Sequence, residues 1–114
     1  IERDSPEKWK TWIEDPEKLA VEGAESMGDV LGRSMDALEK YAERFRGKTF
    51  AVVTHRTVIK PLLAACLGIA SPYFWKVHMD TAAYSVLFHD DIHGYSLYSL
   101  NITGHLSGFT TEWV

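Results

Sequence analysis

Residues 49–57 read TFAVVTHRT, and this stretch restricts the fold more than any other part of the sequence. Its apolar run, residues 49–54, is typical of a strand that is covered on both faces. Residues 58–67, VIKPLLAACL, then follow a helical pattern. Because Pro61 lies near the start of that pattern, we expect the helix to begin after His55 or to have an irregular first turn. Strand, short turn and helix together predict one half of a parallel α/β unit.

The other segments supply too few strands for a complete sheet of this kind. Residues 1–22 predict two short helical turns, and an amphipathic helix follows from a Ser26/Asp29 capping box to about Gly47. A helical turn is expected near Phe74 and Trp75. Strands at 83–88 and 95–100 then flank a hairpin turn, and a loop-like tail ends the sequence. A doubly wound domain needs about four or more parallel strands with helices on both faces. We therefore predict an α/β fold that forms a partial three-layer α/β/α sandwich, in one domain spanning residues 1–114.

Composition and charge argue against some classes of binding partner. The chain has 114 residues, is 46% hydrophobic and carries a formal net charge of −4, whereas nucleic-acid-binding domains usually present a basic face. No apolar run reaches the roughly 18 residues that a membrane span requires. The single cysteine, Cys66, cannot form an intramolecular disulfide, which favours a reducing compartment. We expect a cytoplasmic protein with neither a nucleic-acid nor a membrane partner.

The residues suited to binding or catalysis lie at the end of the predicted strand. Ligands of open α/β sheets bind outside the carboxyl ends of the strands, where His55 lies. The N–H groups that open the next helix favour an anion, and Arg56 adds a guanidinium whose geometry suits phosphate. Lys60 lies one turn further on. These residues predict a phosphate or carboxylate site, and the alternative is a structural histidine at a strand end.

Several motifs, in order along the chain, resemble the histidine phosphatase superfamily, the phosphoglycerate mutase-like enzymes. VVTHRTVIKPLLAACLGI resembles the segment that carries the second histidine of the family. Upstream, GAESMGDVLGR resembles its Gly-Glu-Ser segment; downstream, FWKVHMDTAAYSVLFHDD and NITGHL resemble its aromatic-rich turn with the following strand and its closing His-Leu motif. The resemblance spans roughly residues 20–107, and the His-Arg-Thr-Val form is closest to metal-independent phosphoserine and broad-specificity phosphatases.

The resemblance implies a phosphomonoesterase that works through a phosphohistidine, without a metal or other cofactor, on a small phosphorylated substrate. It assigns His55 as the second catalytic histidine. We expect substrate contacts from Arg56, Thr57, Glu25 and His105, with Arg56 standing where many relatives have a small residue. Arg56 either grips the substrate or points away and pairs with an acid. Glu25 either lines the pocket mouth or only begins its helix, and His105 lies near the site or is a packed or capping residue.

A metal site is the alternative for the remaining histidines. His78, His89 and His93 accompany three aspartates, Asp80, Asp90 and Asp91. The segment HDDIHG is typical of a hairpin turn, however, so we predict a solvated turn and no metal.

The family's nucleophilic histidine lies in an Arg-His-Gly motif, and no arginine of this sequence is followed by histidine. The resemblance thus implies the C-terminal part of a histidine phosphatase domain, with the N-terminal strand and nucleophile loop missing. We expect the chain alone to be inactive and to need a complementing N-terminal half, or to self-associate through its exposed sheet edge. The alternatives are a non-catalytic binding or oligomerisation module, and a phosphoglycerate-type mutase.

Overall fold

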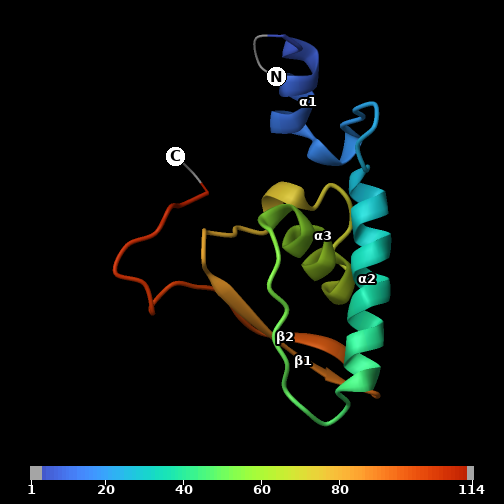
Figure 1. Ribbon diagram of the computed structural model, residues 1–114, viewed down its shortest axis with the longest axis vertical. Coiled ribbons are helices and arrows are strands. Elements are labelled where there is room, and N and C mark those ends of the chain that lie inside the picture. Colours follow the sequence, from blue (N-terminus) through green and yellow to red (C-terminus); the bar gives the residue numbers. More distant parts are fainter. Residues whose placement is uncertain (1–3, 113–114) are drawn as a thin grey trace.

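The computed structural model describes residues 4–112 (Figure 1). Its elements are, in chain order, α1 (Pro6–Glu14), η1 (Pro16–Lys18), α2 (Met27–Arg44), α3 (Arg56–Leu67), η2 (Phe74–Lys76), β1 (Tyr84–Asp90) and β2 (Gly94–Ile102). Helices and strands mix in one chain, so the predicted α/β class is confirmed. The last two residues of the predicted loop-like tail, 113 and 114, lie outside the described residues. Among the residues described, no helix combines the length and apolar character needed to cross a membrane.

Helix α2 begins where the capping-box spacing predicts. The Asp29 N–H donates to the Ser26 hydroxyl at 3.0 Å, and the Ser26 N–H donates to the Asp29 carboxylate at 3.0 Å. Two of the N–H groups that a helix start leaves unpaired are satisfied in this way. The helix ends at Arg44, a little before the predicted glycine, and Gly47 adopts a positive φ of 75° in the connection that follows.

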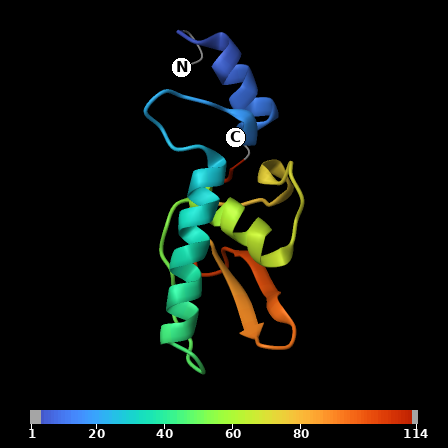
Figure 2. The same cartoon turned by 90° about the vertical axis from the view of Figure 1, so that its right-hand side faces the viewer.

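Helix α3 packs beside α2 and joins the two parts of the core (Figure 2). It begins at Arg56, directly after its N-cap residue His55, and it ends at Gly68 in the left-handed conformation. Its inward face supplies Leu63 and Ala64 to two buried clusters. The partners of these two residues are Val77 and Met79 in one cluster, and Tyr73 and Phe74 in the other.

Strands β1 and β2 form an antiparallel hairpin, as predicted. Each strand is slightly longer than the apolar stretch that predicted it. The pairing register between the two strands is irregular between Tyr84 and Leu87. The turn is fixed by the Asp90 carboxylate, which accepts N–H bonds from Ile92 at 2.9 Å and from His93 at 2.6 Å. The predicted hairpin turn is therefore confirmed.

Residues 49–54, in contrast, do not form the predicted strand. Extended backbone becomes a strand only when another strand pairs with it, and no backbone hydrogen bond links this segment to any other described residue. The prediction that both faces are covered is also wrong, since Val53 is 96% exposed. On the other face, Phe50 packs against Tyr41 and Phe45 of the α2 region, with ring centroids 6.4 and 5.5 Å apart. The segment has the sequence of a central strand without the neighbours of one.

Candidate active site

His55 is the N-cap residue of α3, and its imidazole is exposed. Its carbonyl oxygen accepts the N–H bonds of Val58 and Ile59, both at 2.9 Å, which fixes the first turn. The side chain makes no capping bond and has no polar partner among the described residues. The N–H groups of Arg56 and Thr57 also lack an acceptor within the described chain. An imidazole and two N–H donors are thus free at one helix N-terminus, an arrangement suited to an anion.

Arg56 lies beside this helix start but faces an acid. Its Nε is 4.0 Å from Glu112 Oε1, and its Nη2 donates to the Thr81 hydroxyl at 3.5 Å. Both contacts are long, and 35% of the Arg56 side chain is exposed. The geometry agrees with pairing to an acid and leaves the rest of the guanidinium open, so a substrate contact by Arg56 stays a prediction.

A buried ion pair lies directly under the helix start. Lys60 is completely buried, its Nζ pairs with the Glu112 carboxylate, and only 2% of the Glu112 side chain is exposed. The same Nζ lies 4.4 Å from the ring centroid of Phe74 and 4.7 Å from that of Trp75. Burial lowers the pKa of Lys60, whereas Glu112 opposes this shift. A buried charge without such partners would be strongly unfavourable, so Glu112 ties the C-terminal segment to α3.

Asp80 extends the polar cluster on the other side of Glu112. Its carboxylate accepts the Glu112 N–H at 3.0 Å and the Asn101 amide at 2.8 Å, and His78 Nε2 lies 2.7 Å away. Burial by itself would raise the pKa of Asp80. The hydrogen bonds from Asn101, the Glu112 backbone and His78 outweigh burial and hold that pKa below its usual range. Asp80 therefore stays ionised and holds the tail in place.

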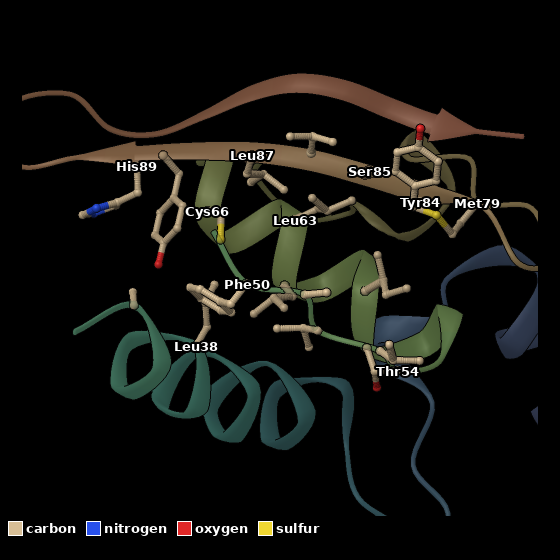
Figure 3. A pocket seen from close by; sticks show the side chains of 18 of the residues that line it. Leu38, Phe50, Thr54, Leu63, Cys66, Met79, Tyr84, Ser85, Leu87 and His89 are labelled. Carbon is tan, nitrogen blue, oxygen red and sulfur yellow. The ribbon is translucent and has the colours of Figure 1, made fainter. Parts of the chain in front are cut away.

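A long apolar groove opens from the site, with a volume of about 2000 Å³ (Figure 3). Residues 49–57 line one side, β1 lines the opposite side, and α3 lies beneath. Thr54 and Tyr84 lie toward the same end of this groove, and His89 lies toward the other (Figure 3). His55 therefore lies near one end of the groove.

Two of the predicted site residues, Glu25 and His105, do not line the groove. The Glu25 carboxylate accepts two bonds from the Arg33 guanidinium, at 2.6 and 3.0 Å, and neither residue lines the groove. His105 Nε2 lies 3.0 Å from the Ala82 carbonyl oxygen, and its ring contacts Tyr84. In this structure Glu25 lies just before the N-cap of α2 and pairs with that helix, and the exposed His105 contacts Tyr84. Their substrate contacts remain predictions.

The histidines weighed as metal ligands are also separated. His78 pairs with Asp80 beside the Glu112 cluster, His93 pairs with Asp90 in the hairpin turn, and His89 packs on Tyr95. Within the described ranges, no group of three potential ligands is close enough to hold a metal ion.

Sequence reasoning missed Glu112. The available signal was Lys60, a charged residue inside the apolar helical run VIKPLLAACL, because a buried lysine needs an acidic partner. The signal does not identify that partner, which lies 52 residues further along the chain by residue number.

Comparison with known proteins identifies the class. The family model of the histidine phosphatase superfamily, branch 1, matches residues 1–103. The chain belongs to this superfamily, which confirms the resemblance. It is 35% identical over 107 residues to phosphoserine phosphatase 1 of Hydrogenobacter thermophilus, covering 94% of this chain and 50% of that protein.

Two further proteins are similar to this chain over most of its length. The bifunctional protein Rv2228c of Mycobacterium tuberculosis is 35% identical over 106 residues, covering 92% of this chain and 28% of that protein. The solved structure of Bacillus stearothermophilus YhfR has a TM-score of 0.84 and 23% identity, covering 92% of this chain and 52% of that one. This likeness shows the fold, and the chain spans about half or less of the length of each relative.

Proposed function

We propose that this chain is the C-terminal part of a histidine phosphatase domain and supplies one side of a phosphomonoesterase site. The observation that carries the proposal is the start of α3, where the exposed His55 imidazole and two free N–H groups lie at the same helix N-terminus. In this reading His55 binds the phosphoryl group and stabilises the charge that develops during its transfer. The free N–H groups of Arg56 and Thr57, and the open part of the Arg56 guanidinium, bind the remaining phosphoryl oxygens.

The other side of the site must contain the nucleophile. Formation of a phosphohistidine requires a second histidine facing His55, and the sequence has no Arg-His pair to supply the family's motif. His78, His89, His93 and His105 are all engaged in the contacts described above. We therefore expect this chain by itself to have little activity, and an N-terminal half to complete the site.

The substrate class follows from the same geometry. Phosphate-binding groups at a helix start recognise the phosphoryl group rather than the rest of the ester. The relative from Hydrogenobacter thermophilus is named a phosphoserine phosphatase. Small phosphomonoesters, with phosphoserine first, are therefore the substrates to test.

A chimera gives the direct test. The part of the Hydrogenobacter protein outside the matched 107 residues is joined to this chain, which replaces those residues. We expect the chimera to hydrolyse 4-nitrophenyl phosphate and phosphoserine, and this chain alone to be nearly inactive. His55→Ala should reduce kcat by about 100-fold or more, the usual effect of losing one transition-state donor. His93→Ala, a change in the exposed hairpin turn, is the matched control and should have little effect.

A folded chimera without turnover would contradict the phosphatase proposal. It would favour the second candidate, a non-catalytic binding module, which is suggested by the missing Arg-His motif. If the chimera instead moves phosphate between positions of a phosphoglycerate, product analysis by ³¹P NMR will identify a mutase.

A further inference from the structure

One acid of the C-terminal segment reaches the first turn of α3. We propose that Glu112 is a positioning residue of the anion site, which fixes the Arg56 guanidinium so that its unpaired N–H groups face a bound phosphate. This role deepens the proposed function and rests on it in one respect, because it takes the phosphoryl group of the substrate as the anion.

Two cations of α3 share the Glu112 carboxylate. Arg56 and Lys60 are four residues apart, so their side chains lie on the same face of the helix. Glu112 Oε1 pairs with Lys60 Nζ and lies 4.0 Å from Arg56 Nε. Burial lowers the pKa of Lys60, and the nearby charge of Arg56 lowers it further. Because like charges at this spacing repel, loss of the acid would turn the guanidinium away from Lys60.

The charge balance leaves Arg56 able to bind an anion. Lys60 and Glu112 are both buried, so their charges neutralise each other inside the protein. Arg56 adds a third charge on a side chain that is 35% exposed. Its Nε faces Glu112 and its Nη2 contacts Thr81, whereas Nη1 has no partner within residues 4–112. One side of the guanidinium is thus held by the protein, and the Nη1 side is open to a phosphate oxygen.

Hydrogen bonds fix the position of Glu112 itself. Its Oε2 accepts the Met79 N–H at 3.0 Å, and its backbone N–H donates to the Asp80 carboxylate at 3.0 Å. Asp80 is held in turn by the Asn101 amide, which donates to it at 2.8 Å. A buried carboxylate with these partners has little freedom to move, so it sets the orientation of the longer and more exposed arginine.

The same region supplies the other contact of Arg56. The Thr81 N–H donates to the Thr110 carbonyl oxygen at 3.0 Å, which joins the C-terminal segment to the loop before β1. The Thr81 hydroxyl accepts from Arg56 Nη2 at 3.5 Å. Both contacts of the guanidinium therefore come from one hydrogen-bonded unit. A side chain held in this way loses less freedom when an anion binds to it.

The positioned guanidinium lies at the anion site. Arg56, Thr81 and Glu112 line the same groove as His55 and Thr57. The guanidinium and the free N–H groups at the start of α3 are thus available to one phosphate, which has several acceptor oxygens. The alternative is that Glu112 draws Arg56 away from the anion. The 4.0 Å separation and the exposure of Arg56 argue against it.

Binding of inorganic phosphate to this chain tests the role of Glu112 without requiring turnover. Glu112→Gln alone leaves the Lys60 charge buried and threatens folding, so the variant is Lys60→Met/Glu112→Gln, which removes both charges. An NMR titration that follows the backbone N–H signal of Thr57 gives the Kd. We expect the double variant to bind phosphate about 10-fold more weakly than the parent, as for the loss of one charge-assisted hydrogen bond.

The decisive comparison repeats the change in an Arg56→Ala background. If Glu112 acts through Arg56, Lys60→Met/Glu112→Gln should weaken binding no further there. An effect on the structure of α3 alone would weaken binding equally in both backgrounds and would overturn the proposal. Glu14→Gln is the control, because this exposed acid pairs with Lys10 outside the groove, and it should leave the Kd unchanged.

The Nε–H signal of Arg56 gives a second measurement in the unmodified chain. A guanidinium held by Glu112 and Thr81 should show a resolved Nε–H signal at neutral pH, and Arg56→Ala identifies that signal by its loss. Phosphate should shift it over the same concentration range as the Thr57 backbone signal. An Nε–H signal that phosphate does not move would overturn the proposal.

The outcomes separate the role of Glu112 from the proposed function. Phosphate binding that depends on Glu112 through Arg56, in a chain whose chimera has no turnover, would support that role and refute the phosphatase proposal. An active chimera, with equal losses of binding in the two Arg56 backgrounds, would do the reverse. Tighter binding by Lys60→Met/Glu112→Gln would show that Glu112 holds Arg56 away from the anion. That result, or no phosphate binding by the folded chain, would also overturn the proposal.

Discussion

At the scale of single residues, the most consequential contact is the buried pair of Lys60 and Glu112. Lys60 lies in the helix that presents His55, and Glu112 lies in the C-terminal segment. The same carboxylate accepts the Met79 N–H at 3.0 Å and lies 3.5 Å from His78 Nδ1. One acid therefore connects three parts of the chain beneath the candidate site.

Glu112→Gln should destabilise the chain by about 3–5 kcal/mol, because it leaves the Lys60 charge buried without its partner. Urea unfolding followed by circular dichroism measures the loss. The double variant Lys60→Met/Glu112→Gln should recover much of it, since no buried charge remains. Glu43→Gln removes an exposed acid that pairs with Arg46 and should change little. Equal losses in the single and double variants would contradict this account.

The lowered pKa of Asp80 predicts that the folded chain loses stability in acid. Its pKa in the folded chain lies below its usual range, because the hydrogen bonds to its carboxylate outweigh burial. The unfolded chain therefore takes up the proton first as the pH falls below about 4. Stability from Asp80 is present above that pH and is lost as the pH falls further toward its folded pKa.

The measurement is the free energy of unfolding between pH 7 and pH 3. Asp80→Asn should be less stable at neutral pH and should lose less stability on acidification than the parent chain. Asp36→Asn, on the exposed part of α2, serves as the control. A parallel fall in all three proteins would show that Asp80 does not titrate in this way.

The thiol of Cys66 should react slowly. Burial raises its pKa to about 11, against a reference near 9. At pH 8 the thiolate fraction should therefore be about 100-fold lower than for an unperturbed cysteine. Alkylation by iodoacetamide in buffer and in urea tests this expectation. Comparable rates under the two conditions would contradict it.

At the scale of elements, α2 depends on its N-terminal cap. Ser26→Ala removes the hydroxyl that accepts the Asp29 N–H and should cost about 1 kcal/mol. Ser107→Ala, in the exposed C-terminal loop, is the matched control and should be nearly neutral. Both are measured by urea unfolding, and equal effects would show that the cap does not limit the stability of α2.

Residues 49–54 show how far local sequence determines an element. Their apolar composition predicts a central strand, and the chain runs through them without a helix or turn (Figure 1). The strand is nevertheless absent, because β-structure is defined by hydrogen bonds to a second segment. Helices α2 and α3 formed as predicted, since their hydrogen bonds lie within the same segment.

At the scale of the whole molecule, the open groove should bind hydrophobic dye. Val52 and Val53 are 47% and 96% exposed, and the groove beside them is mainly apolar. Contiguous apolar surface of this extent marks an interaction site in soluble proteins. The chain alone should therefore enhance the fluorescence of 8-anilinonaphthalene-1-sulfonate at neutral pH, and the folded chimera should do so much less. Equal enhancement by the two proteins would show that the groove stays open.

The sequence by itself determined the local elements and the residues with phosphate chemistry. Helical and alternating apolar patterns identified α2, α3 and the hairpin, and His55 was singled out because a helix follows it directly. Its ordered motifs also identified the superfamily that the comparisons confirm. These features depend on residues that are close together along the chain. The sequence alone therefore reveals them.

Only the tertiary structure decided which distant groups meet. It placed Glu112 against Lys60, paired Glu25 with Arg33 away from the groove, and left residues 49–54 without a partner. Each of these outcomes depends on packing between segments far apart in sequence. Burial makes such packing decisive, because a charge or a backbone group removed from water must find its partner wherever the fold brings one.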